Sequence, residues 1–121
     1  MRTMLILVDG MRPDALTNIE KAQSIIARSK STMTATTVMP SVTLPCHVSL
    51  FHSVDPSEHG VLGNTFVPGE RKGLFEQLRD NGKSTSFFYS WGELKDLYNP
   101  YALCYGHFVS EEYFPHGKVT E

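Results

Sequence analysis

Long apolar stretches, cysteine and surplus charge of either sign are all scarce in this 121-residue chain. No apolar run approaches the length that crosses a bilayer, and the N-terminal run meets a charge too soon for a signal peptide. The net charge is -2, and the sequence has no cluster of basic residues of the kind that binds a nucleic-acid polymer or a membrane surface. Only Cys46 and Cys104 are available for disulfides, so we expect a reduced, cytoplasmic location.

The opening segment has the pattern of a strand, a turn and a helix. Residues 4–8 (MLILV) form a continuous apolar run of strand length, closed by Asp9-Gly10. Such a run is typical of a buried parallel strand. Apolar residues at helical spacing then predict a helix over about residues 14–29. This succession indicates an α/β fold with a mostly parallel sheet and helices on both faces.

The remaining chain continues the alternation of strands and helices. We predict a strand over 31–38, a helix over 43–53, a turn-rich loop over 55–64, a helix over 72–81, a strand over 84–90 and a short helix over 91–98. Beyond Asn99-Pro100 the chain is rich in aromatic residues and shows no clear period.

Three polar side chains follow these elements in a way that suggests chemistry. Asp9 ends the first predicted strand and Thr43 follows the second, so both should lie at the carboxyl edge of the sheet. A threonine hydroxyl is a weak nucleophile that needs a base or a metal. Asp9 could hold a divalent cation, and Asn64 could direct an N–H group at a charged oxygen. Considered singly, the three are better explained as a turn or cap residue, a helix N-cap and a turn residue in a glycine-rich loop.

Two segments together resemble a known family. LILVDGMRPDAL (residues 5–16) and MPSVTLPCHVSLFHSVDPSEHGVLGN (residues 39–64) resemble the alkaline phosphatase superfamily, in particular its type I phosphodiesterase and nucleotide pyrophosphatase branch. The matching motifs are Val8-Asp9-Gly10, the Thr43 to His47 segment, and a Pro-x-x-His-Gly loop from Pro56 to Gly60 that leads to Asn64.

The resemblance implies a role for each of the three residues. Asp9 would be a metal ligand, Thr43 both nucleophile and metal ligand, and Asn64 a contact to a non-bridging phosphoryl oxygen. Two divalent metal ions, zinc before manganese, would be the cofactors. The substrate would be a small phosphate ester such as a diester or a nucleotide.

The chain departs from the family pattern in its second half. The family's later metal ligands, an Asp-x-x-x-His segment, an Asp-His-Gly segment and a final histidine, are not found after Asn64. We therefore expect residues 1–121 to be the N-terminal part of a single, incomplete alkaline phosphatase-like domain, from a longer protein or a truncated product. Little turnover is expected from this chain alone, and exposed apolar surface would favour self-association.

Two alternatives remain open at this point: a non-catalytic α/β piece that only makes interactions, and a phosphonate hydrolase or phosphomutase of the same superfamily. Several other residues are better explained by structure than by chemistry. His47 is expected to be a buried, hydrogen-bonded histidine and His59 a structural loop residue. We expect packing roles for Cys46, Phe66 and Trp91, and for His52 either a surface or a packing role.

Overall fold

The computed structural model describes residues 2–30, 34–65 and 72–110. It divides the chain into two compact units, residues 1–36 and residues 37–121. We describe each unit by itself. The α/β class predicted from the sequence is confirmed, with a parallel pairing in the second unit.

The first unit contains two short helices where one was predicted. The 3-10 helix η1 spans Pro13–Asn18 and α1 spans Glu20–Arg28, so the single helix expected over residues 14–29 is wrong. Ile19 separates the two with an extended backbone (φ -99°, ψ 102°). The Gln23 side chain donates a hydrogen bond to the Leu16 carbonyl across the break, at 2.8 Å. That bond satisfies a carbonyl at the end of η1, which makes the interruption stable.

The buried strand expected at residues 4–8 is not found. These residues belong to no strand, and Met4 and Ile6 are 83% and 74% exposed. An apolar run becomes a strand only when a neighbour pairs with its backbone. The strand predicted over residues 31–38, which could have been such a neighbour, is not found either. Residues 34–38 form no strand, and residues 31–33 lie outside the described part.

The second unit begins with the helix that was predicted most closely. Helix α2 spans Thr43–His52, and its apolar side chains Leu44, Val48 and Phe51 are buried. Pro45 lies in the first turn, where its missing N–H costs no helical hydrogen bond. Ser53 ends the helix in the left-handed conformation. The single-turn helix α3 (Pro56–His59) then occupies part of the expected loop.

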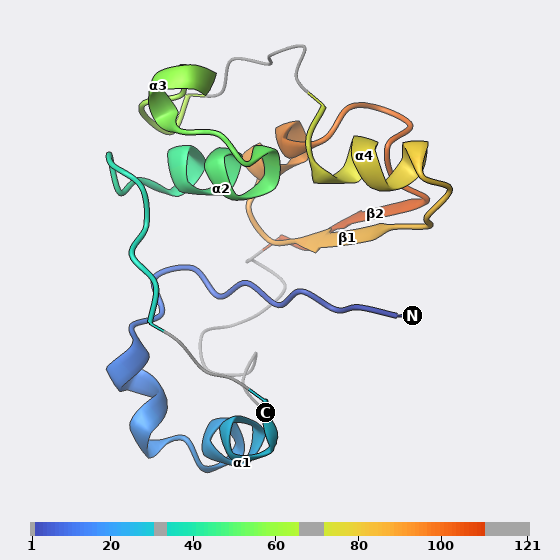
Figure 1. The fold of residues 1–121 in the computed structure, drawn as a ribbon. Helices are drawn as coiled ribbons and strands as arrows, with labels where there is room; N and C mark the ends of the chain where they lie inside the picture. Colours follow the sequence, from blue (N-terminus) through green and yellow to red (C-terminus); the bar gives the residue numbers. More distant parts are fainter. Residues whose placement is uncertain (1, 31–33, 66–71, 111–121) are drawn as a thin grey trace. The chain divides into compact units, whose positions relative to one another are not determined.

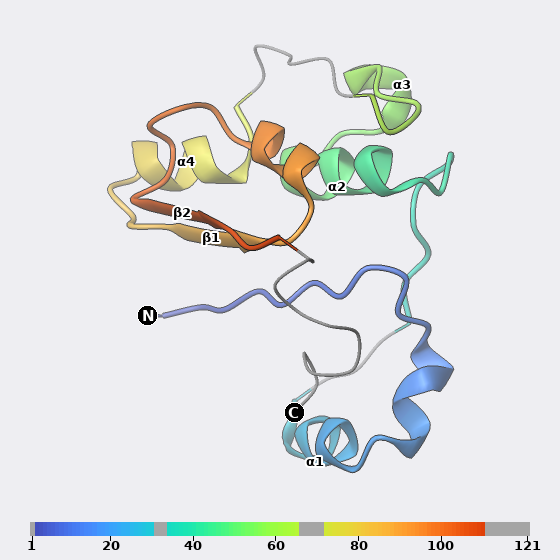
Figure 2. The same ribbon diagram turned by 180° about the vertical axis from the view of Figure 1, so that it is seen from behind.

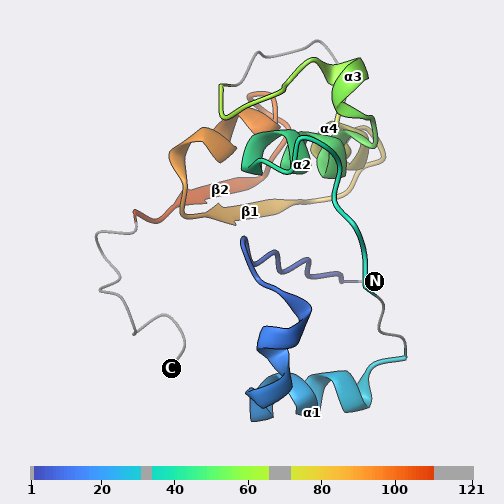
Figure 3. The ribbon, with the colours of Figure 1, turned by 90° about the vertical axis from the view of Figure 1, so that its left-hand side faces the viewer.

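The rest of this unit forms a small sheet covered by helices. Helix α4 (Leu74–Asp80), strand β1 (Ser86–Tyr89), the 3-10 helix η2 (Gly92–Leu97) and strand β2 (Tyr105–Phe108) follow in order. Strands β1 and β2 pair in parallel, with Phe87 opposite Gly106. In all three ribbon views α2, α4 and η2 lie on the same side of this sheet (Figures 1, 2 and 3). Strand β2, where no element was predicted, is therefore a full member of the fold.

The core lies between the helices and one face of the sheet. Its buried apolar residues come from the helices and the loops: Leu44, Val48, Phe51, Val61, Phe75, Leu97 and Ala102. From the sheet, the partly buried Phe87 packs against them. Phe75 is the centre, with ring centroids 5.2 Å from Phe51 and 5.1 Å from Phe87. Trp91 packs against this cluster, as predicted. The opposite face of β1 presents Phe88, which is 64% exposed.

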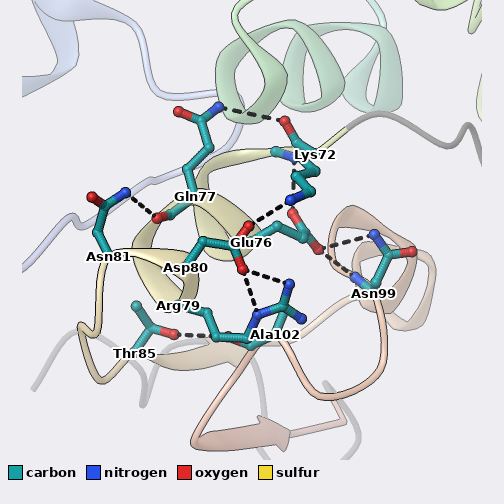
Figure 4. Close-up of polar contacts among 10 residues, drawn as sticks. Lys72, Glu76, Gln77, Arg79, Asp80, Asn81, Thr85, Asn99 and Ala102 are labelled. Atoms are coloured by element: carbon teal, nitrogen blue, oxygen red, sulfur yellow. Dashed lines mark hydrogen bonds and ion pairs between the residues drawn. The ribbon is translucent and has the colours of Figure 1, made fainter.

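A buried carboxylate ties α4 to the chain after η2. Glu76 is 2% exposed and accepts hydrogen bonds from the Gly73 N–H (2.8 Å) and the Asn99 backbone N–H (2.6 Å). The Asn99 side-chain amide adds a third at 3.2 Å (Figure 4). Three N–H donors therefore satisfy the buried carboxyl group of Glu76. Nearby, Lys72 and Arg79 hold Asp80 at the surface.

Within the described ranges, no helix is both long enough and apolar enough to pass through a lipid bilayer.

Candidate functional site

The amino terminus of α2 brings two of the three predicted site residues together. Thr43 is the first residue of the helix. The backbone N–H of Leu44, the next residue, donates a hydrogen bond to Oδ1 of Asn64 at 3.2 Å. Asn64 is twenty positions further along the chain, so this contact places its amide beside the turn that carries Thr43.

This hydrogen bond also caps the amino terminus of α2, because it gives the Leu44 N–H an acceptor. The N-cap residue is Val42, which has no side chain able to cap, so the expectation that Thr43 is merely an N-cap does not describe this helix. Asn64 supplies the acceptor that the first turn needs. Its Oδ1 is directed at an N–H donor, which leaves the Nδ2 amino group as the donor end of the amide. The Asn64 side chain itself is exposed.

Two neighbours of Thr43 on α2 have structural roles. His47 is 7% exposed, and its Nδ1–H donates to the backbone carbonyl of Thr43 at 2.8 Å. The prediction of a buried histidine bonded within the fold is therefore confirmed. Cys46 is half-buried and its Sγ accepts a hydrogen bond from the Thr37 hydroxyl at 2.8 Å. Both contacts fix the first turns of the helix.

The loop between α3 and Asn64 is fastened to α2 by His59. Ser49 Oγ lies 2.9 Å from His59 Nε2, and the Val61 N–H donates to His59 Nδ1 at 3.0 Å. Gly60 turns the chain with a positive φ of 73°, which suits a residue without Cβ. Val61 then enters the core. Sequence reasoning missed the Ser49 partner, because no local pattern links residues in a helix and a later loop.

Asp9 belongs to the first unit and has a turn geometry. Its Oδ1 accepts a hydrogen bond from the Gly10 N–H at 2.9 Å, and Gly10 has a φ of 67°. The side chain is exposed. Thr43 and Asn64 lie in the second unit, so the proximity of Asp9 to Thr43 stays a prediction.

The side chains described here do not by themselves form a metal centre. Within residues 2–30, 34–65 and 72–110, no three histidine, cysteine, aspartate or glutamate side chains are grouped as a metal ion requires. Asp9 and Thr43 offer oxygen atoms of a suitable kind, but two ligands fall short of a typical set. The residues present therefore fit the chemistry of a divalent metal only in part.

The other residues considered from the sequence lie away from this turn. His52 donates from Nδ1 to the Val48 carbonyl at 3.1 Å, a contact within its own helix. Asp80 is a surface residue whose pKa is lowered by the hydrogen bonds and positive charges of Lys72 and Arg79. Phe66 lies outside the described residues.

Comparison with known proteins adds an independent finding. No curated protein and no solved structure matches the chain significantly. The sequence model of the family described as type I phosphodiesterase / nucleotide pyrophosphatase, however, matches residues 3–119. That match includes Asp9, Thr43 and Asn64 and extends through the segment where sequence motifs were lacking. The chain belongs to the type I phosphodiesterase / nucleotide pyrophosphatase family.

Proposed function

We propose that this chain carries the nucleophile of a phosphodiester-hydrolysing site, with Thr43 as the attacking residue. The family suggests a hydrolase of the phosphodiesterase and pyrophosphatase type, acting on small phosphate esters. The observation that carries the proposal is the hydrogen bond from the Leu44 N–H to Asn64, which joins the two motifs at one helix terminus.

The position of Thr43 suits an attack on an anionic ester. It begins a helix of ten residues, so the partial positive charge of the helix terminus favours a phosphate beside it. The Thr43 hydroxyl oxygen would form a bond to phosphorus while the bond to the leaving alcohol breaks. Water would then release the phosphate monoester from Thr43.

Asn64 would stabilise the charge that develops during this step. Its Oδ1 is engaged by the Leu44 N–H, and that contact fixes the orientation of the amide. The Nδ2 amino group would then donate a hydrogen bond to a non-bridging phosphoryl oxygen. Donors held in place before the reaction stabilise a transition state at little cost in reorganisation.

Asp9 completes the proposal as a ligand for a divalent metal. Members of the family generally use such metals. Zinc, or in second place manganese, would activate the Thr43 hydroxyl and neutralise phosphate charge when bound. Asp9 and Thr43 are the ligands that we assign in this chain. With so few ligands, we expect slow turnover.

The test is zinc-dependent release of 4-nitrophenol from bis(4-nitrophenyl) phosphate by the 121-residue chain. We expect Thr43→Ala to lower kcat/KM by at least about a thousandfold, because the attacking oxygen is removed. Ser41→Ala is the matched control, since it removes an exposed hydroxyl two residues earlier. After an acid quench, peptide mass spectrometry should find the phosphoryl adduct on Thr43.

Two outcomes would contradict the proposal. Hydrolysis that survives Thr43→Ala rules out this nucleophile. A chain that binds no zinc by calorimetry and forms no adduct supports the non-catalytic alternative instead.

A further inference from the structure

The segment that follows α2 leads back along the same helix before it reaches Asn64. Helix α2 ends at His52, with Ser53 as its C-cap, and the chain returns through α3, which packs beside α2 (Figures 1 and 3). Asn64 then reaches the opposite end of the same helix, at Leu44. A loop that returns to the start of its own helix needs attachment points, because unattached loops sample many conformations.

His59 supplies two such attachments on the way. Through Nε2 it contacts Ser49, in the middle of α2, and through Nδ1 it accepts the Val61 N–H. Val61 is 2% exposed and belongs to the core. The segment from residue 59 to residue 64 is thus bound to α2 at Ser49, to the core at Val61 and to α2 again at Leu44.

The two contacts define the protonation of the His59 ring. A backbone N–H can only donate, so Nδ1 must be the unprotonated nitrogen that accepts from Val61. In the neutral ring the proton is then on Nε2, which donates to Ser49 Oγ. A ring in this tautomer cannot take a proton from Ser49. The Ser49–His59 pair is therefore not a nucleophile with its base.

We propose that His59 is a positioning residue, which holds the residues 61–64 so that the Asn64 amide stays on the Leu44 N–H beside Thr43. The inference rests on the proposed function, because the position of Asn64 matters for catalysis only if Thr43 attacks there. Its structural part stands on the three hydrogen bonds alone.

The Leu44 amide gives a direct readout. Helix N-terminal N–H groups have no partner within the helix, so the protection of the Leu44 amide from hydrogen exchange depends on Asn64. In the full 15N-labelled chain, His59→Phe keeps a ring and removes both nitrogens. We expect it to lower the protection of the Val61 and Leu44 amides by about fivefold or more.

A second variant should separate the two contacts of His59. The side-chain oxygen of His59→Asn can accept the N–H two residues on, as asparagine does in turns, but the side chain is too short to replace the contact with Ser49. Val61 should therefore regain protection while Leu44 does not. His107→Phe is the matched control, because it makes the same change in β2. If His59→Phe fails to fold by circular dichroism, Ser49→Ala takes its place and should also lower the protection of Leu44.

Unchanged Leu44 exchange in a folded His59→Phe chain would overturn the proposal, even if Val61 loses protection. This measurement requires no turnover. A failure of Thr43 in the hydrolysis assay and a failure of His59 in the exchange experiment are therefore distinguishable.

Discussion

At the scale of single residues, Asn64 combines two functions in one amide. Its oxygen caps α2 through the Leu44 N–H, and its nitrogen is the donor that we propose for a phosphoryl oxygen. A substitution that removes the whole amide therefore changes helix stability and chemistry together. The two functions can be separated, because aspartate retains the acceptor and loses the donor.

We expect Asn64→Asp to fold about as stably as the parent chain, since a carboxylate suits a helix amino terminus. Its hydrolysis should still fall about 100- to 1000-fold in kcat, because the donor to the developing charge is gone. Asn64→Ala should lose this activity and also about 1–3 kcal/mol of unfolding free energy, because the Leu44 N–H loses its acceptor. Urea unfolding and the phosphodiester assay measure the two effects. Equal stability losses in both variants would contradict the separation.

Tyr98 gives the second unit a dependence on alkaline pH. Burial, and then a hydrogen bond with Tyr89, raise the pKa of Tyr98 from 10.0 to about 12. The unfolded chain loses this proton near pH 10 while the folded chain keeps it. The free energy of unfolding should therefore be constant below that pH and fall as the pH rises from about 10 to about 12.

Urea unfolding at several alkaline pH values checks this expectation for Tyr98. Tyr98→Phe should remove the part of the fall in unfolding free energy that Tyr98 causes. Tyr101→Phe is the control, because Tyr101 is 91% exposed. An identical pH dependence in the two variants would show that another group is responsible.

At the scale of elements, the start of α4 is packed too closely for any side chain. A Cβ added at Gly73 would lie 2.9 Å from Nε2 of His52 and 3.2 Å from Oε2 of Glu76. Neither group moves easily, because His52 is bonded to the Val48 carbonyl and Glu76 accepts the Gly73 N–H. The glycine therefore allows α2 and α4 to approach.

We expect Gly73→Ala to lower the free energy of unfolding by about 1–3 kcal/mol, measured by urea denaturation. Gly92→Ala is the matched control: an added Cβ there meets nothing within 4 Å, and the change should stay within about 0.5 kcal/mol. Adding His52→Ala to Gly73→Ala should recover part of the loss. No recovery would mean that Glu76, rather than His52, is the obstacle.

Local sequence signals located some elements and missed others for identifiable reasons. The apolar spacing and stop signals of α2 and α4, and the β-favouring residues of β1, lie within each element itself. Strand β2 reads YGHF, too short and too mixed to show a period. The run at residues 4–8 carried a strand signal, but strand formation depends on a partner that no local pattern supplies.

In the candidate site too, the sequence predicted some features and missed others. The motif order pointed to Thr43 and Asn64, and the structure brings their turns together. The capping role of Asn64 and the Ser49–His59 contact could not be predicted, because each joins residues that are distant in the sequence. The role of Asp9 stays a prediction.

At the scale of the whole molecule, exposed apolar residues are concentrated at the amino terminus. Five consecutive apolar residues, Met4 to Val8, are each at least 43% exposed. An extended apolar segment with an unpaired backbone is an opportunity for pairing between chains. Self-association of this chain is the consequence that we expect.

Sedimentation velocity over a range of concentrations measures it. Ile6→Lys should reduce the associated fraction, because it places a charge in the centre of the exposed run. Ile25→Lys is the control, since Ile25 is also exposed (61%) but lies in α1. Equal reductions in both variants would point to net charge rather than to this segment.

Burial is distributed unevenly along this chain, and that has an evolutionary consequence. The buried residues of the described ranges fall between Leu44 and Ala102, whereas residues 2–30 contribute none. Within residues 2–30, mutational drift should therefore meet little resistance from packing inside this unit. Gly10 has a conformational reason to persist in its positive φ. Wherever descendants of this gene also keep the exposed Asp9, chemistry rather than packing would be the selective force.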